Sequence, residues 1–190
     1  MKVINQATRR VLYREEIPAA EKVVSIFETH TDIIIKDRRD TLFGHKICLS
    51  SGVSSLILDC IILEGNPADS TLPIKMLERH KEIFSCVPDQ ASYDGGFASR
   101  PNLEEIKALG VTDVAFNKRR GIEVSEMART AWIYRNLSYF RAGIEAGISF
   151  LKRCFGLARC MWKGFESFKA YTWASIVSHN LLVLARHRLR

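Results

Sequence analysis

Three charged residues, Arg141, Glu145 and Lys152, are spaced so that one face of a helix would carry all of them. They lie in the stretch YFRAGIEAGISFLKR, at offsets of four and seven residues. At about 3.6 residues per turn, these offsets place the three side chains on one stripe. Gly143 and Gly147 lie on either side of Glu145 and allow close packing or the close approach of a ligand. The same spacing is also typical of an ordinary Arg–Glu pair on a solvated helix, next to an unrelated lysine.

Asp94 is the second candidate for chemistry. It stands at the end of an expected strand, directly before Gly95 and Gly96. Glycines at such a point let the backbone bend sharply and let a bulky anionic ligand come close. Open α/β sheets place their ligand chemistry at the carboxyl ends of strands. The alternative interpretation is an ordinary Asp-Gly turn.

The two candidates together offer the parts of a phosphoryl-transfer site. Two-metal phosphoryl transfer needs carboxylates from distant parts of a chain, because they must converge on the same ions. Hard cations such as Mg²⁺ or Mn²⁺ prefer oxygen ligands. Basic side chains nearby would hold the phosphate backbone of a nucleic acid.

Other ionisable residues have structural interpretations that are equally open. His30 lies between Glu28 and Asp32 near the start of a strand, where a histidine is more often a surface or turn residue than a ligand. His45 precedes another strand and would form a local hydrogen bond. Asp69 is suited to cap a helix.

The elements that must position these residues can be read from local patterns. Strands are expected at residues 2–5, 10–13, 22–28, 33–36, 45–49, 56–63, 90–93 and 111–116. Helices are expected at residues 69–84, 101–110, 134–155 and 165–186, with a short helical piece after residue 125. Asn102 and Glu105 form a capping-box pattern. The run at 56–63 is apolar at both odd and even positions, which predicts a central strand covered on both faces. Asp59 within it is unusual and is expected to be either an edge-facing or a hydrogen-bonded carboxylate.

This order predicts an α/β fold in which helices flank a mixed β-sheet and the C-terminal part is helical. We expect a single domain over 1–190: strand-rich at 1–64, alternating between strands and helices at 65–120, and helical at 121–190. The order is compatible with a ribonuclease H-like fold.

The net charge of +7 is concentrated in one part of the chain. From Ala131 to the C-terminus there are ten Lys and Arg residues against two acidic ones, whereas the preceding part is about neutral. A basic third beside a neutral body suggests a polyanionic partner, although a solvated basic face is the simpler alternative.

The five cysteines and the apolar stretches argue against several classes of protein. The cysteine count is odd and no pair has Cys-x-x-Cys spacing, so a zinc site or a disulfide framework is not expected, and the thiols are predicted to be reduced and mostly buried. The N-terminus lacks the apolar core of a signal peptide. The stretch 171–185 is too short to span a bilayer and is predicted to be a packed helix.

The residues then match a family pattern over nearly the whole chain. The matching segments are VVSIFETHTDIIIK, FGHKICLSSG, LDCIILEGNPADSTL, the DGGFAS box at Asp94, FRAGIEAGISFLKRCFGL and SFKAYTWASIVSHNLLVLAR. In this order, with Arg-x3-Glu-x6-Lys in the fifth, they resemble the DDE catalytic domain of bacterial insertion-sequence transposases, which has a ribonuclease H-like fold.

The resemblance implies two aspartates and one glutamate that bind Mg²⁺ or Mn²⁺. Asp94 matches the second aspartate and Glu145 the glutamate, whereas Asn5 occupies the best match to the first. An asparagine lacks the charge that holds a second dication. Glu28 or Asp32 could replace the missing carboxylate. The basic residues expected to hold DNA are Arg141, Lys152, Arg153, Lys118 and Arg119. The tyrosine of the signature is displaced or absent, because Ser138 occupies its position, with Tyr139 and Phe140 beside it.

Two functions remain open. The first is a metal-dependent DNA strand transferase that acts on the terminal repeats of an insertion sequence, as a possible homodimer in the bacterial cytoplasm at the nucleoid, without a membrane. The second is a degenerate, inactive remnant that binds DNA or another transposase subunit. Asn5, and the expected absence of an upstream DNA-binding region, favour the second.

Overall fold

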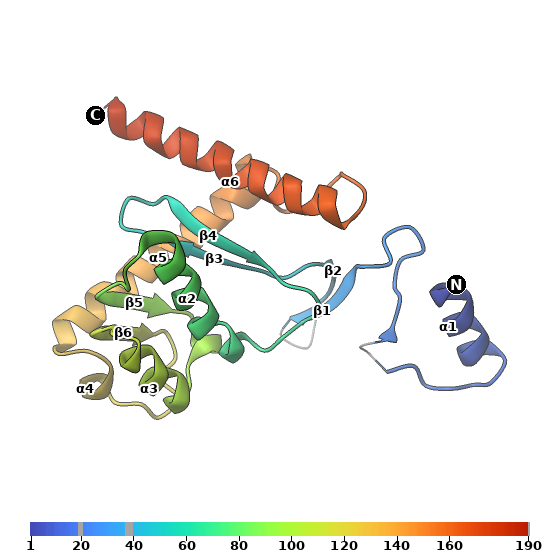
Figure 1. Ribbon diagram of the computed structural model, residues 1–190, viewed down its shortest axis with the longest axis horizontal. Helices are drawn as coiled ribbons and strands as arrows, with labels where there is room; N and C mark the ends of the chain where they lie inside the picture. The colour runs from blue at the N-terminus through green and yellow to red at the C-terminus, as the bar shows by residue number, and fades with distance from the viewer. Residues whose placement is uncertain (19–20, 37–39, 190) are drawn as a thin grey trace. The chain divides into compact units, whose positions relative to one another are not determined.

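The computed structural model describes residues 1–18, 21–36 and 40–189. Four strands follow the first helix, strands and helices alternate in the middle of the chain, and three helices end it, which makes a mixed α/β protein (Figure 1). The strands are β1 (Asp32–Lys36), β2 (Asp40–Gly44), β3 (Ile47–Ser51), β4 (Ile57–Ile62), β5 (Gln90–Tyr93) and β6 (Asp113–Phe116). The helices are α1 (Lys2–Val11), α2 (Pro73–Phe84), α3 (Arg100–Ala108), α4 (Val124–Met127), α5 (Ala131–Cys154) and α6 (Phe165–Arg188), with 3₁₀ turns η2 (Asp69–Thr71) and η3 (Gly95–Phe97).

The chain divides into two compact units. The first unit comprises Met1–Ile47, Ile62–Pro67 and Cys160–Ala174. The second comprises Cys48–Ile61, Ala68–Arg159 and Ser175–Arg190. The second unit contains Asp94 and Glu145, and the first contains Asn5.

The core of the second unit forms around the parallel pair β5 and β6. Their register pairs Gln90 with Asp113 and Tyr93 with Phe116. Every residue of β6 is buried, which fits a strand covered on both faces. Helix α5 packs against both strands, and α2 packs against α3. The apolar core consists of Leu77, Ala98, Leu103, Ile106, Val111, Val114, Phe116, Ile122 and Met127.

Two hydrogen bonds fix where α5 begins and how it lies on the strands. Thr130 caps the helix by accepting from the Ile133 amide at 3.1 Å. The Tyr134 hydroxyl, one turn later, donates to the carbonyl of Phe116 at 2.8 Å. The residues of α5 beyond Tyr134 are therefore held over the carboxyl end of β6.

Strands β3 and β4 form a hairpin whose turn contains Gly52. The Gly52 amide donates to the carbonyl of Leu56 at 3.1 Å. Among the described residues β4 pairs only with β3, so the predicted central strand is wrong, although β4 is largely buried. Asp59 is 3% exposed and accepts two bonds from Arg79, at 2.6 and 2.8 Å, which explains how a carboxylate is tolerated there.

The antiparallel pair β1 and β2 organises part of the first unit. Its register runs from Asp32 opposite Gly44 to Lys36 opposite Asp40. The residues just before β1 and just after β2 therefore lie at the same end of the pair. Strand β1 was predicted, whereas β2 was not.

The strands predicted at 2–5, 10–13 and 22–28 are wrong. Residues 2–11 form α1, which has no Gly or Pro and satisfies its backbone bonds locally. Residues 22–28 are irregular. The Gln6 side chain takes the place of a neighbouring strand there, because its amide oxygen accepts from the Val23 amide at 2.6 Å and its nitrogen donates to the Val23 carbonyl at 3.0 Å.

Two predicted helix caps are also wrong. Ser99, rather than Asn102, caps α3 by accepting from the Asn102 amide, and the Asn102 side chain donates to the carbonyls of Ser70 and Phe97 instead. Asp69 lies within η2, and α2 begins at Pro73 without a side-chain cap. The other predicted helices and strands are present with small shifts in their ends.

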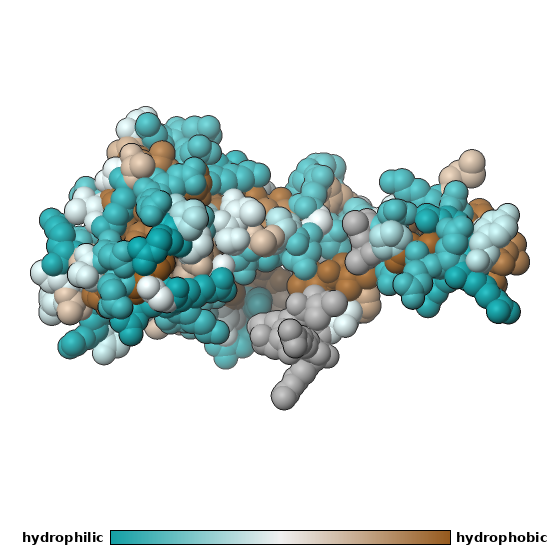
Figure 2. All heavy atoms as spheres, turned by 90° about the horizontal axis from the view of Figure 1, so that it is seen from below, coloured by the Kyte–Doolittle hydropathy of each residue, from teal (hydrophilic) through white to brown (hydrophobic). Residues whose placement is uncertain are grey.

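The exposure of the cysteines shows where one further expectation fails. Of the five cysteines, none of which forms a disulfide, Cys60 alone is buried, so the predicted mostly buried thiols are not found. Apolar side chains are visible at the surface in Figure 2, and around α1 the side chains of Ile4, Val11 and Leu12 are at least 70% exposed. None of the described helices is long and apolar enough to span a membrane.

Candidate functional site

Asp94 directly follows β5 and begins the turn η3. Its Oδ1 accepts from the Gly95 amide at 2.7 Å, and its carbonyl accepts from the Phe97 amide at 3.1 Å. The carboxylate thus caps a tight turn at the carboxyl end of a buried parallel pair. The side chain is 59% exposed, so its second oxygen is accessible to solvent. The position predicted for Asp94 at a strand end is confirmed.

Glu145 lies in the middle of α5 and shares a partner with Asp94. Nη1 of Arg141 donates to Glu145 Oε1 at 2.8 Å and to Asp94 Oδ1 at 3.4 Å. The fold brings them together because α5 packs on β5 and β6, and because Arg141 is one turn before Glu145. Sequence spacing predicted the Arg141–Glu145 pair, and the fold adds Asp94 to it.

Arg141 is the most enclosed of these three side chains. It is 14% exposed, against 62% for Glu145. In the described part of the chain its Nε is buried without a hydrogen-bond partner. A guanidinium held between two carboxylates neutralises their mutual repulsion, as a cation between them would. The arrangement makes Arg141 a neighbour of both carboxylates rather than a separate surface cation.

The donor set fits one divalent cation. Asp94 and Glu145 supply carboxylate oxygens, the ligands that Mg²⁺ and Mn²⁺ prefer, and both already reach one atom. Within the residues that the structure describes, no group of three or more His, Cys, Asp or Glu side chains is arranged to hold a metal ion.

Two further charged side chains lie beside the glycines that follow Asp94. A Cβ on Gly95 would be 2.7 Å from Cγ of Lys118, so that lysine lies directly against the Gly95 backbone. A Cβ on Gly96 would be 2.6 Å from Oδ2 of Asp69. Lys118 was among the predicted DNA-binding residues, whereas Asp69 was interpreted only as a cap. Its proximity depends on contact between η2 and η3, which the local sequence does not show.

The remaining predicted basic residues are exposed at two places in the second unit. Arg119 follows Lys118 in the loop after β6, and Lys152 and Arg153 lie on the last turn of α5. A Cβ on Gly143 or Gly147 would meet no heavy atom within 4 Å among the described residues. The α5 surface around Glu145 is therefore open at both glycines, which favours the approach of a ligand over close packing.

Asn5 lies on α1 rather than at the end of a strand, so the element predicted for it is wrong. The two carboxylates considered as its replacements are engaged elsewhere in the first unit. Glu28 bonds to His30 at 2.7 Å and Asp32 bonds to His45 at 3.2 Å. Sequence analysis missed this cluster because it did not predict β2, which brings His45 to Asp32.

Comparison with known proteins identifies the family. A family model described as "Transposase DDE domain" matches residues 36–181. No curated protein and no solved structure matches the chain. The matched range includes Asp94, Lys118, Arg141, Glu145 and Lys152, and it excludes Asn5. With most of its length matched, and with Asp94 and Glu145 brought to one arginine, the chain belongs to the transposase DDE domain family.

Proposed function

We propose that this chain is the part of an insertion-sequence transposase that cuts and joins DNA strands with the help of Mg²⁺ or Mn²⁺. The single observation that supports this most strongly is the shared contact of Asp94 and Glu145 with Nη1 of Arg141. Two carboxylates from a strand end and a helix, accessible to solvent and facing the same atom, are the arrangement that divalent cations require.

The residues of the chain have separate roles in this proposal. Asp94 and Glu145 would hold the ion. Lys118 and Arg119 in the loop after β6, and Lys152 and Arg153 on the last turn of α5, would hold phosphates of the DNA backbone. Arg141 would contact the phosphate near the cleaved strand, since it lies between the carboxylates.

The reaction class is in-line phosphoryl transfer. Water attacks the first phosphodiester at an end of the element, and the released DNA 3′-hydroxyl then attacks a phosphodiester in the target. The chemistry that a bound divalent ion supplies is stabilisation of the charge on the attacking and leaving oxygens. Asp94 and Glu145 would hold the ion at the reacting phosphate, and the basic side chains would fix the position of the DNA strand.

A second candidate is favoured by one observation. Asn5, the best match to the first aspartate, is neutral, lies on a helix, and falls outside the range that the family model matches. With one carboxylate fewer, a second ion would be held weakly. The chain would then bind DNA, or another transposase subunit, without cutting.

A cleavage assay separates the two. The purified chain is incubated with labelled duplex DNA and Mn²⁺, alongside Asp94→Asn, Glu145→Gln and the control Glu104→Gln, which changes an exposed carboxylate on α3. Metal-dependent cleavage that is lost in the first two variants and kept in the control supports catalysis. Equal cleavage by all four proteins would show a contaminating nuclease and contradict the proposal.

The variant Asn5→Asp completes the comparison. Cleavage by this variant alone would support the inactive alternative and identify position 5 as the lost ligand. The same preparations can be tested for dimer formation on DNA that carries terminal repeats. We propose such a dimer, acting on DNA at the bacterial nucleoid, as the working assembly.

A further inference from the structure

Four ionisable side chains of the first unit form one continuous chain of hydrogen bonds. Glu28 Oε2 lies 2.7 Å from His30 Nε2, His30 Nδ1 lies 2.7 Å from His45 Nε2, and His45 Nδ1 lies 3.2 Å from Asp32 Oδ2. The Gly164 amide donates to Glu28 Oε2 at 2.9 Å. We call these four residues the His30–His45 cluster. It shares no residue with the proposed DNA-cutting site.

The fold of the first unit assembles the cluster. The pairing of Asp32 with Gly44 places the turn before β1 next to the residue after β2, and so brings His30 to His45. The His45 side chain is 4% exposed and packs against Phe165 and Phe168 of α6, with ring centroids 4.8 and 4.9 Å away. His30 is 29% exposed and stacks on His45. One histidine is thus fixed, and the other is accessible.

The two carboxylates dictate which ring nitrogens carry hydrogen. An ionised carboxylate only accepts, so Glu28 requires a hydrogen on His30 Nε2, and Asp32 requires one on His45 Nδ1. A neutral imidazole has a single N–H. When both rings are neutral, His30 Nδ1 and His45 Nε2 therefore face each other as two lone pairs, so their 2.7 Å contact is favourable only with a proton or a metal cation between them.

This pattern matches the way proteins prepare histidines for metals. A metal-binding histidine usually donates its other N–H to a carboxylate or a carbonyl, which fixes the tautomer and aims the free nitrogen. Both histidines have such a carboxylate, on the nitrogen that faces away from the other ring.

We propose that His30 Nδ1 and His45 Nε2 bind one divalent transition-metal ion such as Zn²⁺. Glu28 and Asp32 are the residues that orient the two rings. Imidazole nitrogen suits Zn²⁺, whereas Mg²⁺ and Mn²⁺ prefer the oxygens of Asp94 and Glu145. The site would stabilise the first unit, because its ligands and orienting residues join β1, the end of β2 and the start of α6.

The geometry specifies what must move. Two nitrogens at about 2.05 Å from a tetrahedral Zn²⁺ are about 3.3 Å apart, so the facing nitrogens must separate by about 0.6 Å. His30 can supply this movement because it lies in a turn and is partly exposed, whereas the aromatic rings hold His45. The remaining coordination positions would be filled by water.

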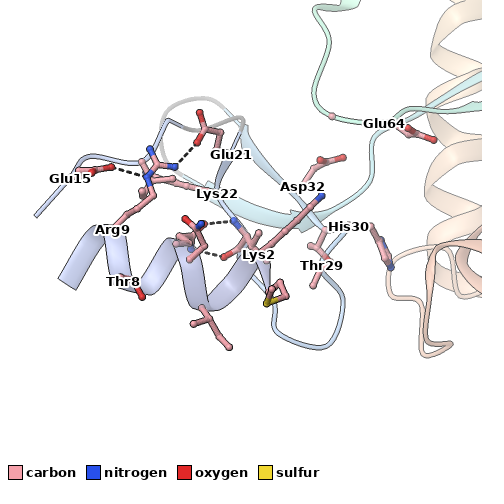
Figure 3. Close-up of a pocket in the computed structure, with 18 of the residues that line it drawn as sticks. Lys2, Thr8, Arg9, Glu15, Glu21, Lys22, Thr29, His30, Asp32 and Glu64 are labelled. Atoms are coloured by element: carbon pink, nitrogen blue, oxygen red, sulfur yellow. Dashed lines mark hydrogen bonds and ion pairs between the residues drawn. The ribbon is translucent and has the colours of Figure 1, made fainter. Parts of the chain in front are cut away.

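Water has access to this position. His30, Asp32, His45 and Glu64 all line a cavity of about 1330 Å³ in the first unit. Figure 3 shows His30, Asp32 and Glu64 on one side of this cavity and α1 on the other. Glu64 adds negative charge near His45, which favours a cation there.

The test uses Co²⁺ as a spectroscopic probe of the full chain, followed by competition with Zn²⁺. We expect saturable binding of one Co²⁺ per chain, with visible absorption bands that Zn²⁺ removes. His30→Gln should weaken binding by at least about tenfold, and Glu28→Gln by about tenfold, as loss of an orienting carboxylate does. His187→Gln, which changes an exposed histidine of the second unit, should leave the affinity unchanged.

Two further measurements make the result decisive. Zn²⁺ should shift the ¹⁵N resonances of His30 Nδ1 and His45 Nε2 while the outer nitrogens stay protonated. Asp94→Asn should leave Zn²⁺ binding intact, so failure of the proposed catalysis would not affect this result. The proposal is overturned if no saturable binding occurs, if His30→Gln binds as tightly as the unaltered chain, or if the facing nitrogens respond only to protons.

Discussion

Asp94 and Glu145, on a strand end and on a helix, meet at one nitrogen atom of Arg141. Helix α5 makes this possible because it packs on β5 and β6 and is tied to β6 by Tyr134. Any cation bound between the two carboxylates must compete with the guanidinium for the same oxygens. Binding of metal and release of Arg141 toward a DNA phosphate would therefore be linked.

Replacing Arg141 with Gln should raise the affinity of the chain for Mn²⁺ several-fold. The change removes the competing positive charge while the carboxylates stay in place. Electron paramagnetic resonance of free Mn²⁺ measures the effect. The control Arg135→Gln alters an exposed arginine on the same helix and should have no effect. Unchanged or weaker Mn²⁺ binding in Arg141→Gln would show that the guanidinium does not compete.

Replacing Lys152 with Gln should weaken DNA binding and make it less sensitive to salt. Each phosphate contact that is lost lowers the slope of log K against log salt by about 0.9. Fluorescence anisotropy with duplex DNA at several salt concentrations gives the slope. Lys75→Gln, on the exposed face of α2, serves as the control. Equal slopes for the two variants would remove Lys152 from the DNA-binding surface.

Replacing Gly143 with Ala should stabilise the second unit by about 1 kcal/mol, since alanine favours a helix interior over glycine by roughly that amount. Nothing within 4 Å obstructs the added methyl group among the described residues. Urea denaturation measures the change, and Ala146→Gly, exposed on the same helix, should produce the opposite effect. Destabilisation by Gly143→Ala would indicate a packing partner at this surface.

Asp113 should be a principal source of acid sensitivity. It is fully buried at the start of β6 and accepts from the Arg129 side chain and amide and from Gln90. The Arg129 guanidinium is the main cause that lowers the pKa of Asp113 to about 2. A carboxyl with a lowered folded-state pKa contributes stability above its unfolded pKa, and that contribution is lost as the pH falls from about 4 to 2.

Replacing Asp113 with Asn should lower the free energy of unfolding at pH 7 by about 2 kcal/mol, because hydrogen bonds to a buried charge are lost. It should also flatten the dependence of stability on pH between about 4 and 2. Chemical denaturation at a series of pH values measures both effects. The exposed neighbour Asp89→Asn is the control. An unchanged acid slope in Asp113→Asn would assign the sensitivity to other groups.

Local sequence patterns predicted the elements correctly in two cases: helices, whose backbone hydrogen bonds form within the segment, and strands that are buried on both faces. Strands β5 and β6 and helices α2, α5 and α6 were predicted near their observed ends, because apolar periodicity and turn residues mark them. Helical spacing alone predicted that Arg141, Glu145 and Lys152 share one face of α5. The contact between Arg141 and Asp94 could not be predicted in this way, because it also depends on the pairing of β5 with β6 and on the packing of α5 against them.

The failures have physical causes that the sequence does not display. Residues 22–28 have the composition of a strand. The backbone N–H and C=O of Val23, however, form their hydrogen bonds with the Gln6 side chain and not with a neighbouring strand. Val3 and Ile4 favour extended structure, but without a strand to pair with, α1 forms. Asp69 approaches Gly96 through contact between two turns that are distant in sequence.

The central claim is that Asp94 and Glu145 hold one divalent cation together, and a double-mutant cycle of Mn²⁺ binding tests it most directly. Asp94→Asn, Glu145→Gln and the double variant are titrated with Mn²⁺ and compared with the unaltered chain. A shared site predicts that each single change weakens binding strongly and that the second change adds little. Two independent, additive losses, or no loss in either single variant, would contradict the claim.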